Sequence, residues 1–189
     1  MKIENLQIYN LLGAIKASKY PMTTDTKKCN YEITPTVLEL GKQPRGTAHD
    51  NFLNGIVVVF DLTFSNKAWV EFERYHFAEI VSSQSTMHRI AKFDIKKCVN
   101  SYVTQNTIDE VNRLKDIYKK DPTPENYLTL LYNVPSGLEL TAQIVTNYGQ
   151  LKPILSKVSF TLLDIVAASA VVLRRLLTPN NIFAILLRK

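Results

Sequence analysis

The densest group of side chains able to do chemistry lies between Trp69 and Arg89, in the segment WVEFERYHFAEIVSSQSTMHR. These 21 residues hold two arginines, two histidines, three glutamates and three serines. Guanidinium groups and hydroxyls suit a phosphate, because arginine presents a planar fork of N–H donors. Histidine can carry protons or contact a cofactor. The segment therefore indicates an anion or nucleotide site, and the alternative is a solvated helix face followed by a loop.

No other motif competes with this segment. The sequence has no GxGxxG, GxxxxGK[ST], HExxH or GxSxG pattern. His76 and His88 are twelve residues apart without flanking ligands, so we expect no metal site. Cys29 and Cys98 form neither a CxxC pair nor a zinc spacing, which fits a reducing, cytoplasmic location.

Composition indicates one globular domain with an appendage at most. The chain has 189 residues, 46% of them hydrophobic, and a net charge of +6. A basic balance favours an anionic partner or is simply a soluble surface. No run of Lys and Arg resembles a nucleic-acid arm, so we expect no nucleic-acid partner. The longest apolar run, Val158–Leu173, is short and contains Asp164, so we expect no membrane span.

The elements that must position the segment follow from periodicity. Residues 56–64, IVVVFDLTF, are β-branched and aromatic and predict a strand. Asn66 then offers an N-cap for a helix. The helical spacing of its apolar face predicts that this helix carries Trp69, Phe72, His76, Phe77 and Ile80, with a polar loop from residue 81 to 89.

The flanking regions predict mainly loops and helices. Residues 1–18 suit a short strand or helix, and residues 20–50 read as loops. Thr107 with Glu110, and Ser136 with Glu139, have capping-box spacing, and Pro124 can occupy the first position of a helix. The second box predicts a helix through residues 140–152. The fold class expected is α+β (mixed α/β).

Three blocks resemble the flavin-dependent thymidylate synthases, the ThyX family. That family has the signature Gln-x-x-Arg-His-Arg-x-x-Ser, and Arg74 agrees with it, whereas Glu71, Tyr75 and His76 replace Gln, His and Arg. A divergent branch found in phages and Firmicutes is closer. It is matched by Trp69-Val-Glu-Phe with Ser85-Thr-Met-His-Arg, by His49-Asp-Asn-Phe-Leu ahead of the strand, and by the stretch from Tyr132 to Tyr148. The resemblance spans about residues 45–152.

The resemblance implies a fold with a central antiparallel sheet flanked by helices, and a homotetramer whose sites are shared between subunits. It also implies synthesis of dTMP from dUMP with methylenetetrahydrofolate, FAD and NADPH. The residues then expected at dUMP are Glu71, Arg74, Ser83, Ser85, Arg89 and Gln143. Those expected at FAD are His49, Arg74, Tyr75, His76, Ser82 and Asn147.

The end of the chain departs from the family pattern. Gln143 and Val158 stand where two family arginines are expected, and Lys157 is the nearest cation for a catalytic role. After Lys152 the sequence becomes apolar, which suggests a ThyX-like domain at residues 1–152 and an atypical tail at 153–189. Two alternatives stay open. One is a catalytically impaired relative that binds nucleotide or flavin, and the other is an interaction protein whose apolar tail docks on a partner.

Overall fold

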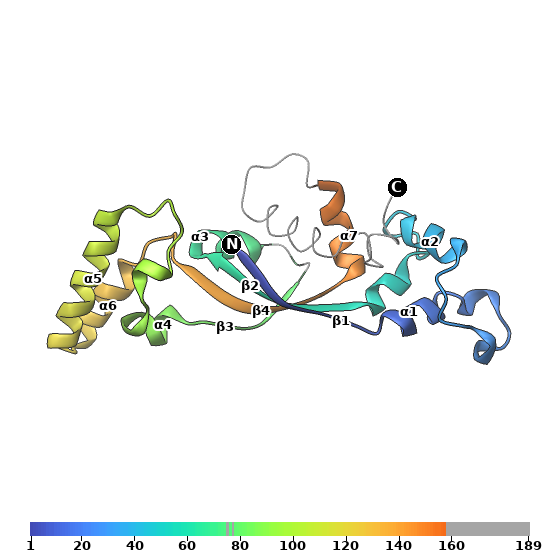
Figure 1. Cartoon of the computed structure of the whole chain (residues 1–189), viewed down its shortest axis with the longest axis horizontal. Helices are drawn as coiled ribbons and strands as arrows, with labels where there is room; N and C mark the ends of the chain where they lie inside the picture. The colour runs from blue at the N-terminus through green and yellow to red at the C-terminus, as the bar shows by residue number, and fades with distance from the viewer. Residues whose placement is uncertain (75, 77, 158–189) are drawn as a thin grey trace.

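An antiparallel sheet of four strands runs along the molecule, with helical segments at both of its ends (Figure 1). The computed structural model describes residues 1–74, 76 and 78–157. The strands are β1 (Lys2–Tyr9), β2 (Val57–Ser65), β3 (Glu79–Ser83) and β4 (Glu139–Asn147), in the order β1-β2-β4-β3. Helices combined with an antiparallel sheet confirm the expected α+β class.

Strands β2 and β4 form the centre of the sheet and of the core. Every second residue of β2 is buried, as expected for a strand with one covered face. Phe60 lies opposite Ile144 across the ladder, and both are buried. Helices α3 (Asn66–Phe72) and α7 (Tyr148–Lys157) lie on the same side of the sheet (Figure 1). The strand predicted at residues 56–64 is therefore confirmed, with both bounds one residue later.

The segments around β1 build one end of the molecule. They are α1 (Leu11–Ala17), η1 (Tyr20–Met22), η2 (Thr26–Lys28), α2 (Pro35–Lys42) and η3 (Asn51–Gly55). The first 18 residues thus contain both a strand and a helix. The prediction of loops throughout residues 20–50 is wrong at α2. There the Thr34 hydroxyl accepts the Val37 N–H, and Pro35 begins the helix. The many Pro, Gly, Thr and Lys residues of this region predict loops and do not indicate this helix start.

Helix α3 is shorter than its apolar spacing predicts. Its N-cap is Ser65, whose hydroxyl accepts the Ala68 N–H at 3.3 Å, rather than Asn66. The helix ends at Phe72, so the expected continuation to Ile80 is wrong. Ile80 belongs instead to β3, opposite Ile144 of β4. Pairing with β4 satisfies the backbone groups of this polar stretch, which helical spacing could not reveal.

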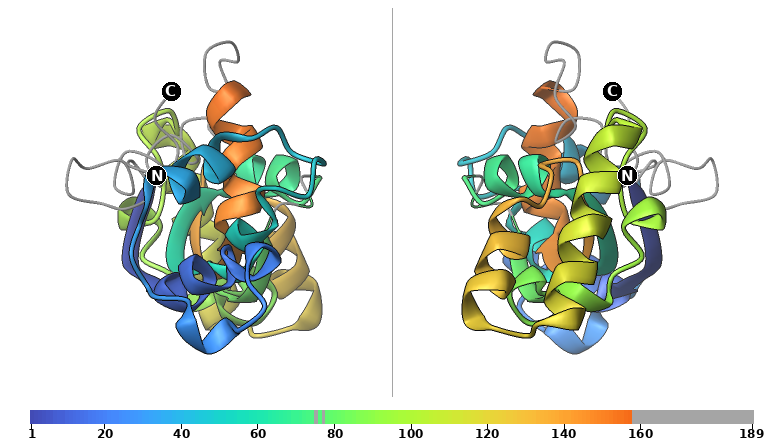
Figure 2. Two further views of the ribbon diagram at one scale, coloured as in Figure 1. Left: turned by 90° about the vertical axis from the view of Figure 1, so that its right-hand side faces the viewer. Right: turned by 90° about the vertical axis from the view of Figure 1, so that its left-hand side faces the viewer.

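The opposite end is helical. It contains α4 (Thr86–Arg89), η4 (Ile90–Lys92), η5 (Ile95–Lys97), α5 (Gln105–Lys120) and α6 (Pro124–Tyr132). Figure 2 shows α5 and α6 side by side, and the rings of Tyr118 and Tyr127 lie 5.0 Å apart between them. Pro124 begins α6 as predicted, but Thr104 rather than Thr107 caps α5.

The prediction of a helix through residues 140–152 is wrong for its first half. Residues 139–147 form β4, in which burial alternates from Leu140 to Thr146. The two-residue period of burial is that of a strand, and β4 pairs with β2 on one side and with β3 on the other. These pairings favour the strand over the helix that the capping-box spacing predicts. Helix α7 follows and continues past Lys152. None of the helices in the described residues is long and apolar enough to cross a membrane.

Candidate functional site

The chemically dense segment from Trp69 to Arg89 divides among α3, β3 and α4. Trp69 anchors it, because its indole N–H donates to the Leu140 carbonyl oxygen at 3.1 Å. The Trp69 ring also meets Phe64 and Phe72 edge to face, with centroids 5.5 and 5.4 Å away. These contacts fix α3 on the covered face of the sheet.

A pocket of about 370 Å³ opens between α3 and β3. Its walls are mostly apolar, and two of its lining residues, Glu73 and Ser83, bring a carboxylate and a hydroxyl. The others are Asn66, Trp69, Val70, Ile80 and Leu140. Of the residues expected at dUMP, Ser83 is the one that lines this pocket. The mixture of an aromatic wall with a few polar groups is typical of a small-molecule site.

Arg74 lies just beyond the end of α3 and is paired with an acidic residue of that helix. Its Nη1 lies 3.1 Å from Glu71 Oε2, and Lys67 Nζ lies 3.6 Å from Glu71 Oε1. The Arg74 side chain is 74% exposed, so this pair is a surface contact that a stronger anionic ligand can displace. His76 is also exposed, and Tyr75 lies outside the described residues.

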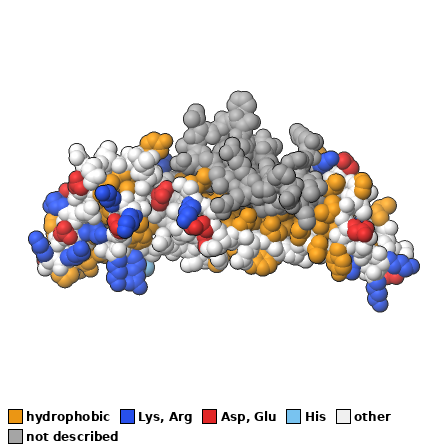
Figure 3. Space-filling model, in the orientation of Figure 1, with side chains coloured by type: hydrophobic (Ala, Val, Ile, Leu, Met, Phe, Trp, Pro, Cys, Tyr) orange, Lys and Arg blue, Asp and Glu red, His pale blue; other side chains and the backbone are white. Residues whose placement is uncertain are grey.

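The three expected serines do not share one face. Ser82 lies opposite Gln143 on the open side of the sheet, whereas Ser83 lies opposite Ala142 on the covered side. Ser85 directly precedes α4, and Arg89 is the last residue of that helix. Tyr127 of α6 holds α4 in place by donating its hydroxyl to the Met87 carbonyl oxygen at 2.7 Å. On the face that Figure 3 shows, Lys and Arg side chains gather at this end of the molecule.

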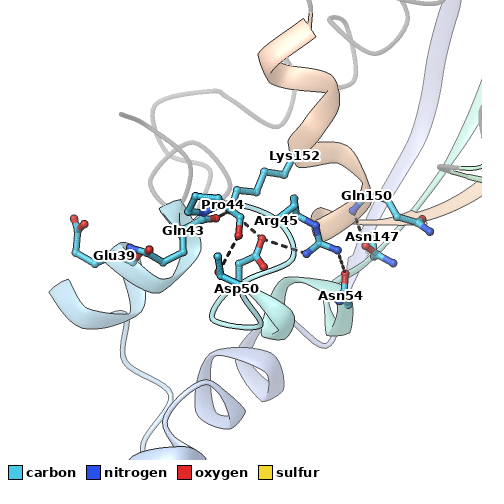
Figure 4. A network of polar contacts seen from close by, with 10 residues as sticks. Glu39, Gln43, Pro44, Arg45, Asp50, Asn54, Asn147, Gln150 and Lys152 are labelled. Atoms are coloured by element: carbon cyan, nitrogen blue, oxygen red, sulfur yellow. Dashed lines mark hydrogen bonds and ion pairs between the residues drawn. The ribbon is translucent and has the colours of Figure 1, made fainter.

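A second polar group lies at the other end of the sheet, where the loop before η3 meets α7 (Figure 4). Asp50 is fully buried, with 0% exposure. Its Oδ2 receives Arg45 Nη1 at 3.2 Å and Lys152 Nζ at 2.9 Å. Arg45 Nη2 also donates to Asn54 Oδ1 at 3.1 Å, and Lys152 donates to the Gln43 carbonyl oxygen. His49, expected at the flavin, is exposed beside this network.

Asn147 caps α7 at the same place. Its Oδ1 accepts the Gln150 N–H at 2.9 Å, and Figure 4 shows Asn147 in the same region as Arg45 and Asn54. Gly149 permits this approach, because a Cβ there would lie 2.1 Å from Asn54 Oδ1 and 2.9 Å from Arg45 Nη1. The structure thus brings His49 and Asn147 to one region. Lys157 is the last residue of α7.

Sequence reasoning missed Arg45, Asp50, Asn54 and Lys152. Asp50 lies within the block that begins at His49 and Asn54 directly follows it, but nothing in the sequence signals that Asp50 is buried and contacts Lys152. Tyr148 begins α7 and is buried. Burial raises the pKa of its phenol far above the ordinary value, so the hydroxyl keeps its proton. Among the described residues, no three His, Cys, Asp or Glu side chains are grouped so as to hold a metal ion.

Comparison with known proteins reveals relatives by fold alone. No protein-family model and no curated protein matches the sequence. Solved structures do match, among them thymidylate synthase X (ThyX) from Helicobacter pylori with FAD and dUMP. That match has a TM-score of 0.70 at 12% identity and covers 92% of each chain.

A second structure of the flavin-dependent thymidylate synthase ThyX from Helicobacter pylori, complexed with FAD and dUMP, gives a TM-score of 0.69 at 12% identity. It covers 94% of this chain and 92% of the other. The chain therefore has the mixed helix and antiparallel-sheet fold of ThyX.

Proposed function

We propose that this protein is a flavin-dependent thymidylate synthase-like enzyme. It would methylate dUMP to dTMP, with methylenetetrahydrofolate as the carbon donor and NADPH as the reductant. The observation that carries the proposal is the agreement of fold, over 92% of each chain, with a ThyX structure that contains FAD and dUMP. The three sequence blocks that resemble the family support it independently.

The proposed nucleotide site uses the α3–β3–α4 region. Arg74 and Arg89 would bind the phosphate or the uracil edge of dUMP through their planar guanidinium groups. Ser83, Ser85 and Gln143 would complete this site, and Glu71 would border it as the carboxylate that Arg74 releases when the phosphate binds. The pocket beside Ser83 supports the assignment, since it offers an aromatic wall and a hydroxyl next to α3.

The proposed flavin site uses His49, Asn147, Ser82, Tyr75 and His76, with Arg74 shared between the two ligands. The polar side chains around Asn147 fit a flavin nucleotide, because they present N–H donors toward solvent beside a helix start. FAD, when bound, supplies the hydride chemistry. The chain's own side chains would bind and orient the ligands and keep their reacting edges together.

A shared site explains why the expected residues lie at two places along the sheet. Ser83 is opposite Ala142, and Asn147 lies five residues further along β4, or about 17 Å at the usual rise of a strand. A uracil ring at Ser83 and a flavin ring at Asn147 of one chain would lie too far apart to react. We propose a cytoplasmic homotetramer in which the two regions of neighbouring subunits meet.

The experiment that tests the proposal follows tritium release from dUMP labelled at the carbon that is methylated. The full chain, supplied with FAD, NADPH and methylenetetrahydrofolate, is expected to release tritium. Arg74→Ala and Arg89→Ala should weaken dUMP binding by about tenfold each, since each removes a charge-assisted contact. Lys92→Ala, an exposed basic residue of η4, is the matched control. No release from FAD-loaded protein would contradict the proposal.

A relative that binds these ligands without turnover is the second candidate. It is favoured by the Glu71 carboxylate, which pairs with Arg74, and by the uncharged Gln143 where a family arginine is expected. Saturable FAD and dUMP binding without tritium release would identify it. An interaction protein with a docking tail would bind neither ligand. Of that tail, residues 153–189, positions 158–189 lie outside the described residues. The division into residues 1–152 and 153–189 stays part of this proposal.

A further inference from the structure

The Arg45 guanidinium is held firmly but keeps donors to spare. An arginine side chain has five N–H donors. One on Nη1 contacts Asp50 and one on Nη2 contacts Asn54, while about a third of the side chain, 34%, is exposed. Two partners of fixed position set the plane of the guanidinium. A positioned arginine with unused donors at the surface is suited to an anion.

The two neighbouring amides also present donors outward. Asn54 Oδ1 accepts from Arg45, and Asn147 Oδ1 accepts from the Gln150 N–H. Both acceptors are therefore used inside the protein. Within the part of the chain that the structure describes, neither Nδ2 group has a hydrogen-bond partner. Figure 4 shows Arg45, Asn54 and Asn147 in one region, and Gly149 of α7 lies against the first two.

The net charge of this cluster is positive, which also favours an anion. Arg45 and Lys152 both point at Asp50, so two positive charges share one buried carboxylate. One positive charge is left over. The cluster also lies beside the N-terminus of α7, whose backbone dipole favours negative charge. A positioned arginine with unused donors, next to a helix N-terminus and with surplus positive charge, fits a phosphate group.

We propose that Arg45, Asn54 and Asn147 form a binding site for a phosphate-class anion at the start of α7. The inference extends the proposed function, in which Asn147 faces the flavin, by adding two residues that the sequence blocks do not assign. The anion would be a phosphate of the flavin nucleotide or of the nucleotide substrate. Gly149 leaves room for the ends of the Asn54 and Arg45 side chains, which any side chain at position 149 would displace.

The test measures pyrophosphate binding to the full chain by titration calorimetry. Arg45→Gln is expected to weaken binding about tenfold, because it removes the charge and the fork. Lys92→Gln, an exposed basic residue at the opposite end, is expected to change it less than twofold. Equal affinity in the wild type and Arg45→Gln, or no pyrophosphate binding by the wild type, would overturn the proposal.

A second variant tests the site even if Arg45→Gln fails to fold. Asn54→Asp keeps the acceptor for Arg45 at an exposed position and replaces the outward N–H donors with a negative oxygen. It should abolish pyrophosphate binding without a change in circular dichroism. Unchanged binding by a folded Asn54→Asp protein would also overturn the proposal.

The source of the anion is resolved with three further ligands. If it belongs to the flavin, Arg45→Gln weakens FAD but leaves riboflavin unchanged. If it belongs to the substrate, Arg45→Gln weakens dUMP and leaves FAD unchanged. Pyrophosphate binding that depends on Arg45, in a protein without flavin affinity, would support this site and contradict the proposed function.

Discussion

The carboxylate of Asp50 and the ammonium group of Lys152 lie 2.9 Å apart although 102 positions separate them in the chain. This ion pair joins the loop before η3 to helix α7, and Arg45 adds a second cation to the same oxygen. The contact brings His49 and Asn147 into one region. It therefore links the stability of the fold to the geometry of the proposed flavin site.

Replacement of Asp50 by Asn is expected to destabilise the protein by about 3 kcal/mol, because it leaves two partly buried cations without their counter-charge. Urea unfolding measures this loss. Asp94→Asn is the matched control, since Asp94 pairs with Lys97 at an exposed position and its loss should leave the unfolding midpoint unchanged. Equal unfolding midpoints for Asp50→Asn and the wild type would show that the network contributes nothing to stability.

Asn147 is expected to have two separable roles, one as a helix cap and one at the flavin. Asn147→Ala removes the cap of α7 and should cost about 1 kcal/mol of stability. Asn147→Asp keeps the capping oxygen but loses the outward N–H donors. We expect normal thermal stability and weaker FAD binding for Asn147→Asp, measured by calorimetry and flavin fluorescence. Wild-type FAD affinity in this variant would remove Asn147 from the flavin site.

Glu71→Gln should strengthen dUMP binding by about tenfold. The Glu71 carboxylate occupies Arg74 and would repel the phosphate of the nucleotide, so a neutral amide releases the guanidinium. Equilibrium titration with dUMP measures the change. Glu110→Gln, which breaks the similar pair with Arg113 on α5, should have no effect. Weaker dUMP binding by Glu71→Gln would mean that the carboxylate itself contacts the ligand.

Cys98 is expected to react slowly in the folded protein. Burial, assisted by the charge of Asp94, raises the pKa of its thiol, so less thiolate exists at about pH 8. Native protein then holds the proton to higher pH than the unfolded chain. The free energy of unfolding should accordingly fall as pH rises from the ordinary thiol pKa through the raised pKa of the folded protein. Iodoacetamide labelling at Cys98, followed by mass spectrometry, should be faster in urea. Equal rates would contradict the shift.

Local sequence patterns predict some elements of the fold correctly and others incorrectly. The β-branched run of β2 and the start of α6 at Pro124 are readable because one residue type dominates each signal. Strand β4 is not, since Ser136 and Glu139 imitate a capping box and only pairing with β2 and β3 selects the extended form. The predicted helix is longer than α3 because Ile80 continues the helical spacing of Trp69 and Phe72, although it belongs to β3.

The candidate site divides in the same way. The concentration of charged and hydroxyl side chains between Trp69 and Arg89 is visible in sequence, and so is the block at His49. The opposite orientations of Ser82 and Ser83 depend on the register of β3 against β4. The burial of Asp50 depends on a contact with Lys152 from the far end of the chain. Neither feature has a local signature.

Both proposed sites require that this chain binds a flavin nucleotide, which an absorbance spectrum can detect. Purified full-length protein is mixed with excess FAD, passed through a desalting column, and its spectrum is compared with that of protein without added FAD. We expect a yellow protein fraction with flavin bands and about one FAD per chain. A colourless protein fraction, with all of the flavin in the small-molecule fraction, would show that the chain does not bind FAD.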